Sequence, residues 1–266
     1  MAVLSWIRRH LLAFAALAVL TLLLVPNVVV AVFSFNDPVG KFNYNWARFS
    51  TDAWTHPCGS PGICESLGLS LRIGVTASLI ATVLGTMVAL ALGRYQFRGR
   101  AATNLLIFVP MATPEVVMGS SLLTLFLMLG IPAGALAILI AHIMFCVSFV
   151  VVAVKARVAT LDPRLEEAAA DLGATPAQTF LRVTLPLAAP GIAAGALLAF
   201  SLSFDDYIIT NFNASPSSIT FPMFVWGAAQ RGVPVQVNVI GTVVFLAALL
   251  FVIAGQVLSN RRQRAV

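Results

Sequence analysis

Four ionisable side chains lie inside long apolar stretches of this 266-residue sequence: Glu115, His142, Asp205 and Asp206. A charged side chain at membrane depth is costly, and it usually faces a partner or a water-filled path. Carboxylates in surroundings of low dielectric constant attract cations and repel anions such as sulfate or phosphate. We therefore predict that Glu115, Asp205 and Asp206 lie along a path for a positively charged solute. The residues show neither metal-ligand spacing nor a nucleophile motif, so the sequence predicts no catalytic residue and no metal site.

Other roles remain open for these side chains. Arg72, near the end of the second apolar run, could neutralise an acidic residue in a structural salt bridge. His142 is expected to be a hydrogen-bonded core residue, because no second histidine or series of acidic residues accompanies it as a proton relay would require. Four aromatic residues could hold the methylene stems and ammonium groups of an amine, or anchor the chain at the membrane interface: Trp46, Trp54, Tyr207 and Trp226.

Two of the three cysteines, Cys58 and Cys64, lie close together in the segment PCGSPGIC. A disulfide between them is one interpretation, in an oxidising compartment. Free thiols are the other, because short loops strain the bond. A metal site with His56 is less favoured, because the spacing matches no known zinc pattern. Cys146 is expected to be a small core residue.

The composition excludes a soluble enzyme, because 59% of the residues are hydrophobic and only 10% are charged. Soluble domains carry about 25% charged residues. A membrane helix needs roughly 20 mostly apolar residues, and six runs meet this length. They cover 11–33, 69–92, 103–129, 135–154, 188–212 and 235–258.

These six runs predict an all-α, multi-pass membrane protein with a single transmembrane domain over 1–266. They are continuously apolar over twice the length of a barrel strand, about ten residues. The first run is longer than the core of a signal peptide, so we interpret it as an uncleaved anchor. Pro110, Pro114 and Glu115 interrupt the third run.

The basic residues predict the orientation of the chain. Cytoplasmic loops carry an excess of Lys and Arg. With six spans, twelve of the 16 basic residues fall on one side. They are Arg8, Arg9, Arg94, Arg98, Arg100, Lys155, Arg157, Arg164, Arg182, Arg261, Arg262 and Arg264. Both termini are therefore predicted to be cytoplasmic, and the net charge of +6 reflects orientation in a bilayer rather than binding to nucleic acid.

The loop 155–187 holds the most charged internal stretch, and its local pattern predicts two short helices. Asp162 can cap the first helix, with a proline directly after it. Gly173 is a natural helix end. Thr175 repeats the cap-and-proline start, and Pro186 is expected to end the second helix just before the fifth span.

The same loop resembles the EAA loop of type I ABC importer permeases (MetI-like fold). The matching residues, in order and spacing, are Glu167, Ala168, Ala169, Ala170 and Gly173, followed by Val183, Leu185 and Pro186, with Val in place of Ile. In that family the loop docks into a groove on a separate ATPase subunit. The resemblance implies coupling residues at Glu166, Glu167, Ala168, Ala169, Asp171 and Gly173. The chain lacks a Walker-type loop, so ATP and Mg²⁺ are expected on the partner and no cofactor on this non-catalytic subunit.

A finer resemblance lies in the PEVV and SFDDYIIT segments, which are similar to spermidine/putrescine permeases, particularly the C-type subunit. It implies alternating access for a small cationic solute in a bacterial inner membrane. It also implies an ATPase dimer, a second homologous permease and an extracytoplasmic binding protein that meets the loop FNDPVGKFNYNWARF. Ferric iron, thiamine, or an opine or amino-acid derivative are alternative solutes. An ion-coupled secondary transporter is the more distant alternative, and no internal repeat supports it.

Overall fold

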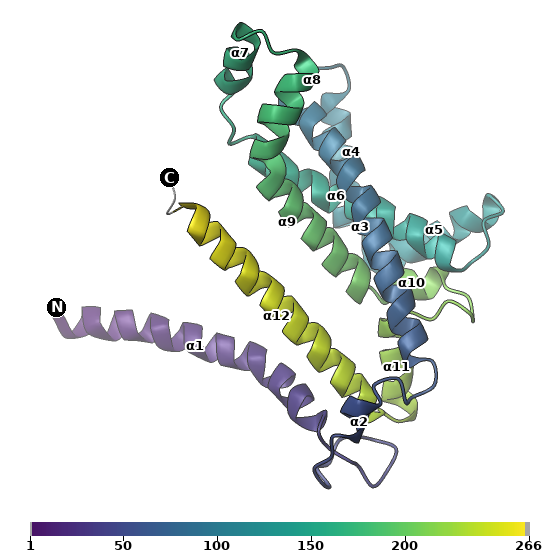
Figure 1. The fold of residues 1–266 in the computed structure, drawn as a ribbon. Coiled ribbons are helices and arrows are strands. Elements are labelled where there is room, and N and C mark those ends of the chain that lie inside the picture. The colour runs from purple at the N-terminus through teal and green to yellow at the C-terminus, as the bar shows by residue number, and fades with distance from the viewer. Residues whose placement is uncertain (1, 264–266) are drawn as a thin grey trace. The chain divides into compact units, whose positions relative to one another are not determined.

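The computed structural model describes residues 2–263 as a set of helices (Figure 1). Contacts group the chain into two units, Met1–Cys64 with Val225–Val266, and Glu65–Phe224. Of the basic residues that predicted the orientation, Arg264 lies outside the described residues, as do the side chains of Arg8, Arg9, Arg261 and Arg262. The interpretation of 1–266 as one domain stays a prediction.

The first unit contains two long helices, α1 (Ala2–Phe33) and α12 (Val235–Gln263), and the short helix α2 (Asp52–Thr55). α12 contacts both α1 and α2. The loop after α1 is ordered by buried amides: Asn36 Nδ2 donates to Asn43 Oδ1 at 2.6 Å, and Asn43 Nδ2 donates to the Phe33 carbonyl at 2.8 Å. This polar core gives the loop a defined shape although it contains little regular structure.

The second unit is built around α6 (Ala135–Val158), which packs against α4, α5, α9 and α10. Its other helices are most of α3 (Ile63–Arg94), α4 (Arg100–Ala112), α5 (Glu115–Met128), α7 (Arg164–Asp171), α8 (Pro176–Thr179), α9 (Leu185–Asp205), α10 (Ile208–Asn213) and the start of α11 (Phe221–Arg231). Small residues allow close approach: a Cβ on Gly191 of α9 would collide with Arg157 of α6, and one on Gly85 of α3 would lie 2.7 Å from Val150. Such contacts are typical of membrane helices.

Five of the described helical segments are long and apolar enough to cross a membrane, or six if one bent pair counts as a span. That pair is α4 and α5, which meet at 108°. The predicted run 103–129 is therefore two helices rather than one straight span. Thr113 is extended, with φ −80° and ψ 129°, because a residue before proline avoids the helical region.

The fifth predicted run also differs from the structure at both ends. α9 ends at Asp205, and Asp206 is extended, so the predicted run 188–212 breaks before α10 begins. At the other end, Pro186 does not end a helix. α8, a π-helical turn (Phe180–Thr184) and α9 form one helical segment, Pro176–Asp205. Pro186 lies inside this segment, shortly after the π-helical turn, and the helix continues through it as it does through Pro190 of α9.

Candidate functional site

The charged loop begins two helices where its local pattern predicted, although the second, α8, continues into α9 instead of ending at Pro186. The Asp162 carboxylate accepts a hydrogen bond from the Arg164 N–H at 2.9 Å at the start of α7. Gly173 has φ +80° after the end of α7, and the N–H groups of Gly173 and Ala174 donate to the carbonyls of Ala170 and Ala169. This is the Schellman arrangement of a helix end. Thr175 and Gln178 form a capping box at the start of α8.

The two adjacent glutamates of α7 lie in different surroundings. Glu166 Oε1 lies 3.1 Å from Arg94 Nη2 at the end of α3, and it accepts a hydrogen bond from Thr184 Oγ1 at 2.9 Å. The side chains of Arg94 and Glu166 are 17% and 31% exposed. Glu167 is exposed. Of the other predicted coupling residues, Ala169 is half-buried. Ala168, Asp171 and Gly173 are exposed.

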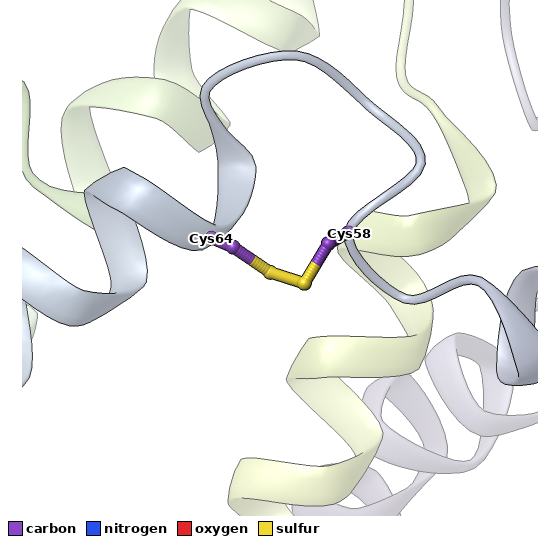
Figure 2. The surroundings of a disulfide bond; sticks show 2 residues. All are labelled: Cys58 and Cys64. Atoms are coloured by element: carbon purple, nitrogen blue, oxygen red, sulfur yellow. A yellow bond between two sulfur atoms is a disulfide. The ribbon is translucent and has the colours of Figure 1, made fainter.

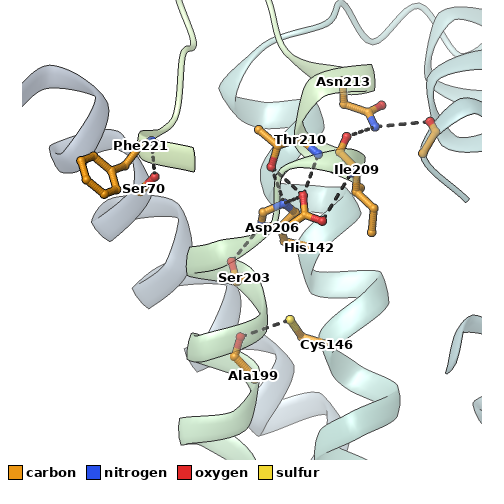
Figure 3. A network of polar contacts seen from close by, with 11 residues as sticks. Ser70, His142, Cys146, Ala199, Ser203, Asp206, Ile209, Thr210, Asn213 and Phe221 are labelled. Carbon is orange, nitrogen blue, oxygen red and sulfur yellow. Dashed lines mark hydrogen bonds and ion pairs between the residues drawn. The ribbon is translucent and has the colours of Figure 1, made fainter. Parts of the chain in front are cut away.

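A polar network joins α6 to the break between α9 and α10 (Figure 3). His142 of α6 is 1% exposed, and its Nδ1 lies 2.7 Å from Ser203 Oγ of α9. Its Nε2 lies 3.3 Å from Asp206 Oδ2 and 3.0 Å from Thr210 Oγ1. His142 is thus a hydrogen-bonded core residue, as predicted. The structure supplies the acidic neighbour that the sequence alone did not reveal.

Asp206 is held from several directions. Its Oδ2 accepts hydrogen bonds from the Thr210 N–H at 2.7 Å and from Thr210 Oγ1 at 2.8 Å. The Ile209 N–H points at Oδ1 at 3.4 Å. The carboxylate therefore caps the start of α10, where the helix dipole favours negative charge. Its side chain is 5% exposed.

Asp205 and Glu115 differ from Asp206, because both are exposed. Glu115 begins α5, directly after the bend, and α5 packs against α10 through Gly119 and Phe212. This packing brings the segment that begins with Glu115 to the segment that follows Asp205 and Asp206, although the two are far apart in the sequence. Among the described residues, Arg72 makes no ion pair with any of the three acids.

Two predicted aromatic contacts lie in different units. Tyr207 is half-buried in the break between α9 and α10. Trp46 belongs to the loop after α1, where its exposed ring meets Phe33 edge-on with the ring centroids 6.3 Å apart. In the same unit, Cys58 and Cys64 are joined in a disulfide with Cα atoms 5.4 Å apart (Figure 2). The bond closes the loop between α2 and the start of α3.

Comparison with known proteins identifies the chain. Residues 76–266 match the family described as binding-protein-dependent transport system inner membrane component. The chain belongs to this family. The matched range contains the capped loop, the polar network and Glu115. Family membership makes the protein a multi-pass membrane component of a transport system.

Two curated relatives of this family member come from Escherichia coli (strain K12). The spermidine/putrescine transport system permease protein PotC is 36% identical over 93% of this chain and 93% of its own length. The putrescine transport system permease protein PotI is 38% identical over 84% of this chain and 82% of its own. Among solved structures, a chain of a bacterial ABC transporter involved in the import of alginate has 18% identity and a TM-score of 0.68, covering 97% of this chain and 96% of that chain. This likeness shows the type I importer permease fold.

Sequence reasoning did not find two partners in this permease, Arg94 and His142. The sequence predicted for Arg94 only a part in the orientation of the chain. It predicted that His142 is a core residue with no role beside the three acidic residues. The spacing along the chain carries no signal for either contact: His142 lies 61 residues from Ser203 and 68 from Thr210. Only a comparison of many related sequences for covarying positions could have found them.

Proposed function

We propose that this chain is the permease subunit of an ATP-driven importer that moves a small organic cation, a polyamine such as spermidine or putrescine, by alternating access. The family, the two polyamine permeases among its relatives and the importer fold support the class. A binding protein delivers the solute, a second homologous permease completes the path, and an ATPase dimer supplies the energy. ATP and Mg²⁺ bind to that ATPase.

The choice of a cation rests on Asp205, an exposed carboxylate in the same region as two further acidic residues, Glu115 and Asp206. Carboxylates in surroundings of low dielectric constant repel one another and attract a positively charged solute. The two ammonium groups of a diamine match two exposed carboxylates, Asp205 and Glu115. Asp206 contributes charge and fixes the backbone, because its oxygens are engaged within the protein.

The capped helix α7 is the proposed docking element for the ATPase. Its exposed face carries Glu167, Ala168 and Asp171. A short helix with caps at both ends behaves as a stiff body, so a push on it is transmitted to the segment Pro176–Asp205 instead of being absorbed in a loose loop. Glu167 offers a negative charge to a basic residue of the ATPase groove.

The remaining proposals concern placement in the membrane. Both termini and α7 face the cytoplasm of a bacterial cell, in line with the distribution of Lys and Arg. The loop 34–62 then faces the oxidising side, where the bond between Cys58 and Cys64 is stable. We propose that the binding protein contacts this loop. The exposed Trp46 could then contact the amine or the binding protein.

Reconstitution tests the function directly. The chain is co-purified with its ATPase, second permease and binding protein, placed in proteoliposomes, and supplied with labelled spermidine, putrescine, thiamine or ferric iron. We expect ATP-dependent uptake of the polyamines that a proton ionophore leaves intact. Asp205→Asn with Glu115→Gln should reduce this uptake, while Glu65→Gln, which changes an exposed acid in the first turn of α3, should not. Uptake that an ionophore abolishes and ATP depletion spares would contradict the proposal. Uptake of thiamine or iron without uptake of polyamines would show that the proposed solute is wrong.

A further inference from the structure

The Glu166 carboxylate joins three structural elements at one oxygen atom. Glu166 lies in the first turn of α7, and its Oε1 meets both Arg94, the last residue of α3, and Thr184, the last residue of the π-helical turn before α9. Thr184 is buried. Three helices that are separate in sequence therefore share one polar contact at the same end of the second unit.

The charges at this contact are well placed and depend on each other. An acidic residue in the first turn of a helix and a basic residue in the last turn are each favoured by the helix dipole. Arg94 is mostly buried, and its Nε has no hydrogen-bond partner among the described residues. Removing Glu166 would leave the guanidinium of Arg94, whose side chain is 17% exposed, without its counter-ion.

The contact gives α7 a second connection to the long helices. One connection is covalent, through α8 and the π-helical turn into α9. π-helical turns inside α-helices often mark functional sites. The other connection is the ion pair to the end of α3. A displacement of α7 would then move the ends of α3 and α9 together.

We propose that Glu166 is a positioning residue that transmits the movement of α7 to α3 through Arg94, whereas Glu167 contacts the ATPase. This inference rests on the proposed function of α7 as the docking element. It assigns different tasks to two adjacent glutamates, and it makes Arg94 part of energy coupling as well as of membrane orientation.

The test separates ATPase binding from coupling in the reconstituted complex. The readouts are co-purification of the ATPase and the number of ATP molecules hydrolysed per solute transported. Glu166→Gln and Arg94→Gln should each retain the ATPase and raise the ATP cost per solute by about two- to thirtyfold, the range seen for mutations along coupled contacts. The double variant should be no worse than either single one, because both remove the same contact. Glu167→Gln should weaken co-purification instead.

Three further variants complete the test. Arg98→Gln, an exposed arginine just beyond α3, should behave as wild type. Thr184→Val removes one hydrogen bond at nearly constant volume, and it should raise the ATP cost less than Glu166→Gln does. The exchange Arg94→Glu with Glu166→Arg should recover part of the coupling, although both charges then oppose their helix dipoles.

The outcomes separate this inference from the proposed function. Loss of the ATPase in Glu166→Gln would make Glu166 a docking residue and overturn the inference. An unchanged ATP cost in both single variants, with normal uptake by the wild type, would overturn this inference and leave the proposed function intact. A wild-type complex without ATP-driven uptake would overturn the proposed function and the inference together.

Discussion

Two acidic pairs, Glu166–Glu167 in α7 and Asp205–Asp206 at the end of α9, divide their tasks in the same way. One member of each pair is engaged inside the protein: Glu166 with Arg94 and Thr184, and Asp206 with His142 and Thr210. The other member is exposed. In α7, neighbours point about 100° apart at 3.6 residues per turn, so Glu166 and Glu167 cannot face the same partner. Asp205 and Asp206 diverge because the helix ends between them and Asp206 is extended.

The surroundings of the two engaged acids differ in depth. Asp206 is 5% exposed and receives hydrogen bonds at the start of α10, whereas Glu166 is 31% exposed and bridges helix ends. Replacement of Asp206 should therefore affect folding more than replacement of Glu166. The exposed members, Asp205 and Glu167, should affect function with little effect on folding. An acidic residue can be essential to transport for either reason, and stability measurements distinguish them.

The largest expected effect is that of Asp206→Ala. It leaves the Thr210 N–H without its acceptor and takes the carboxylate away from the Thr210 hydroxyl and His142, and each buried group that loses a partner costs about 1–3 kcal/mol. We expect a loss of about 3 kcal/mol or more in the free energy of unfolding, measured by denaturant titration in detergent micelles. Asp205→Ala is the matched control and should change it by less than about 0.5 kcal/mol. Equal losses in the two variants would contradict the division of tasks.

A smaller effect is expected from Ser203→Ala in the same network. The variant removes the partner of His142 Nδ1, which lies 2.7 Å from the hydroxyl. The expected loss is about 1 kcal/mol, measured in the same way, because His142 keeps its contacts at Nε2. Ser201→Ala, which changes an exposed serine on the same helix, should have almost no effect. A loss in Ser201→Ala of the same size would show that the measurement reports helix propensity and not the network.

The ion pair of Arg94 and Glu166 should show a coupling energy of about 0.5–1 kcal/mol in a double-mutant cycle of unfolding free energies. The value is modest because the pair is partly exposed to solvent. It should fall as salt is added, since salt screens charges that water can reach. A cycle between Arg98 and Glu166 is the control and should give no coupling. Zero coupling for Arg94 and Glu166 would mean that the two charges act independently.

The smallest effect on stability is expected for Glu167→Arg. The unfolding free energy should change by less than about 0.5 kcal/mol, because the side chain is exposed. Co-purification of the ATPase should nevertheless be lost, because a positive charge replaces the negative one at the proposed docking face. A variant that retains the ATPase and transports normally would remove Glu167 from the docking face.

The sequence alone determined the features that depend on neighbouring residues. Long apolar runs predicted the membrane-spanning class, because backbone groups in lipid must be satisfied within a helix. The caps at Asp162 and Thr175 and the end at Gly173 followed from hydrogen bonds over a few residues. The prediction for Pro186 was wrong, because the helical segment Pro176–Asp205 continues through it, and membrane helices tolerate internal prolines such as Pro190 of α9.

Only the tertiary structure decided which charged residues meet. The order of the residues does not state how α6, α9 and α10 pack, so His142 and Asp206 looked unrelated until the helices were placed side by side. The angle of 108° between α4 and α5 likewise depends on the contacts that each helix makes, although Pro114 marks the break. Local chemistry selects helices and their ends, whereas the partners of buried charges depend on packing between segments far apart in the chain.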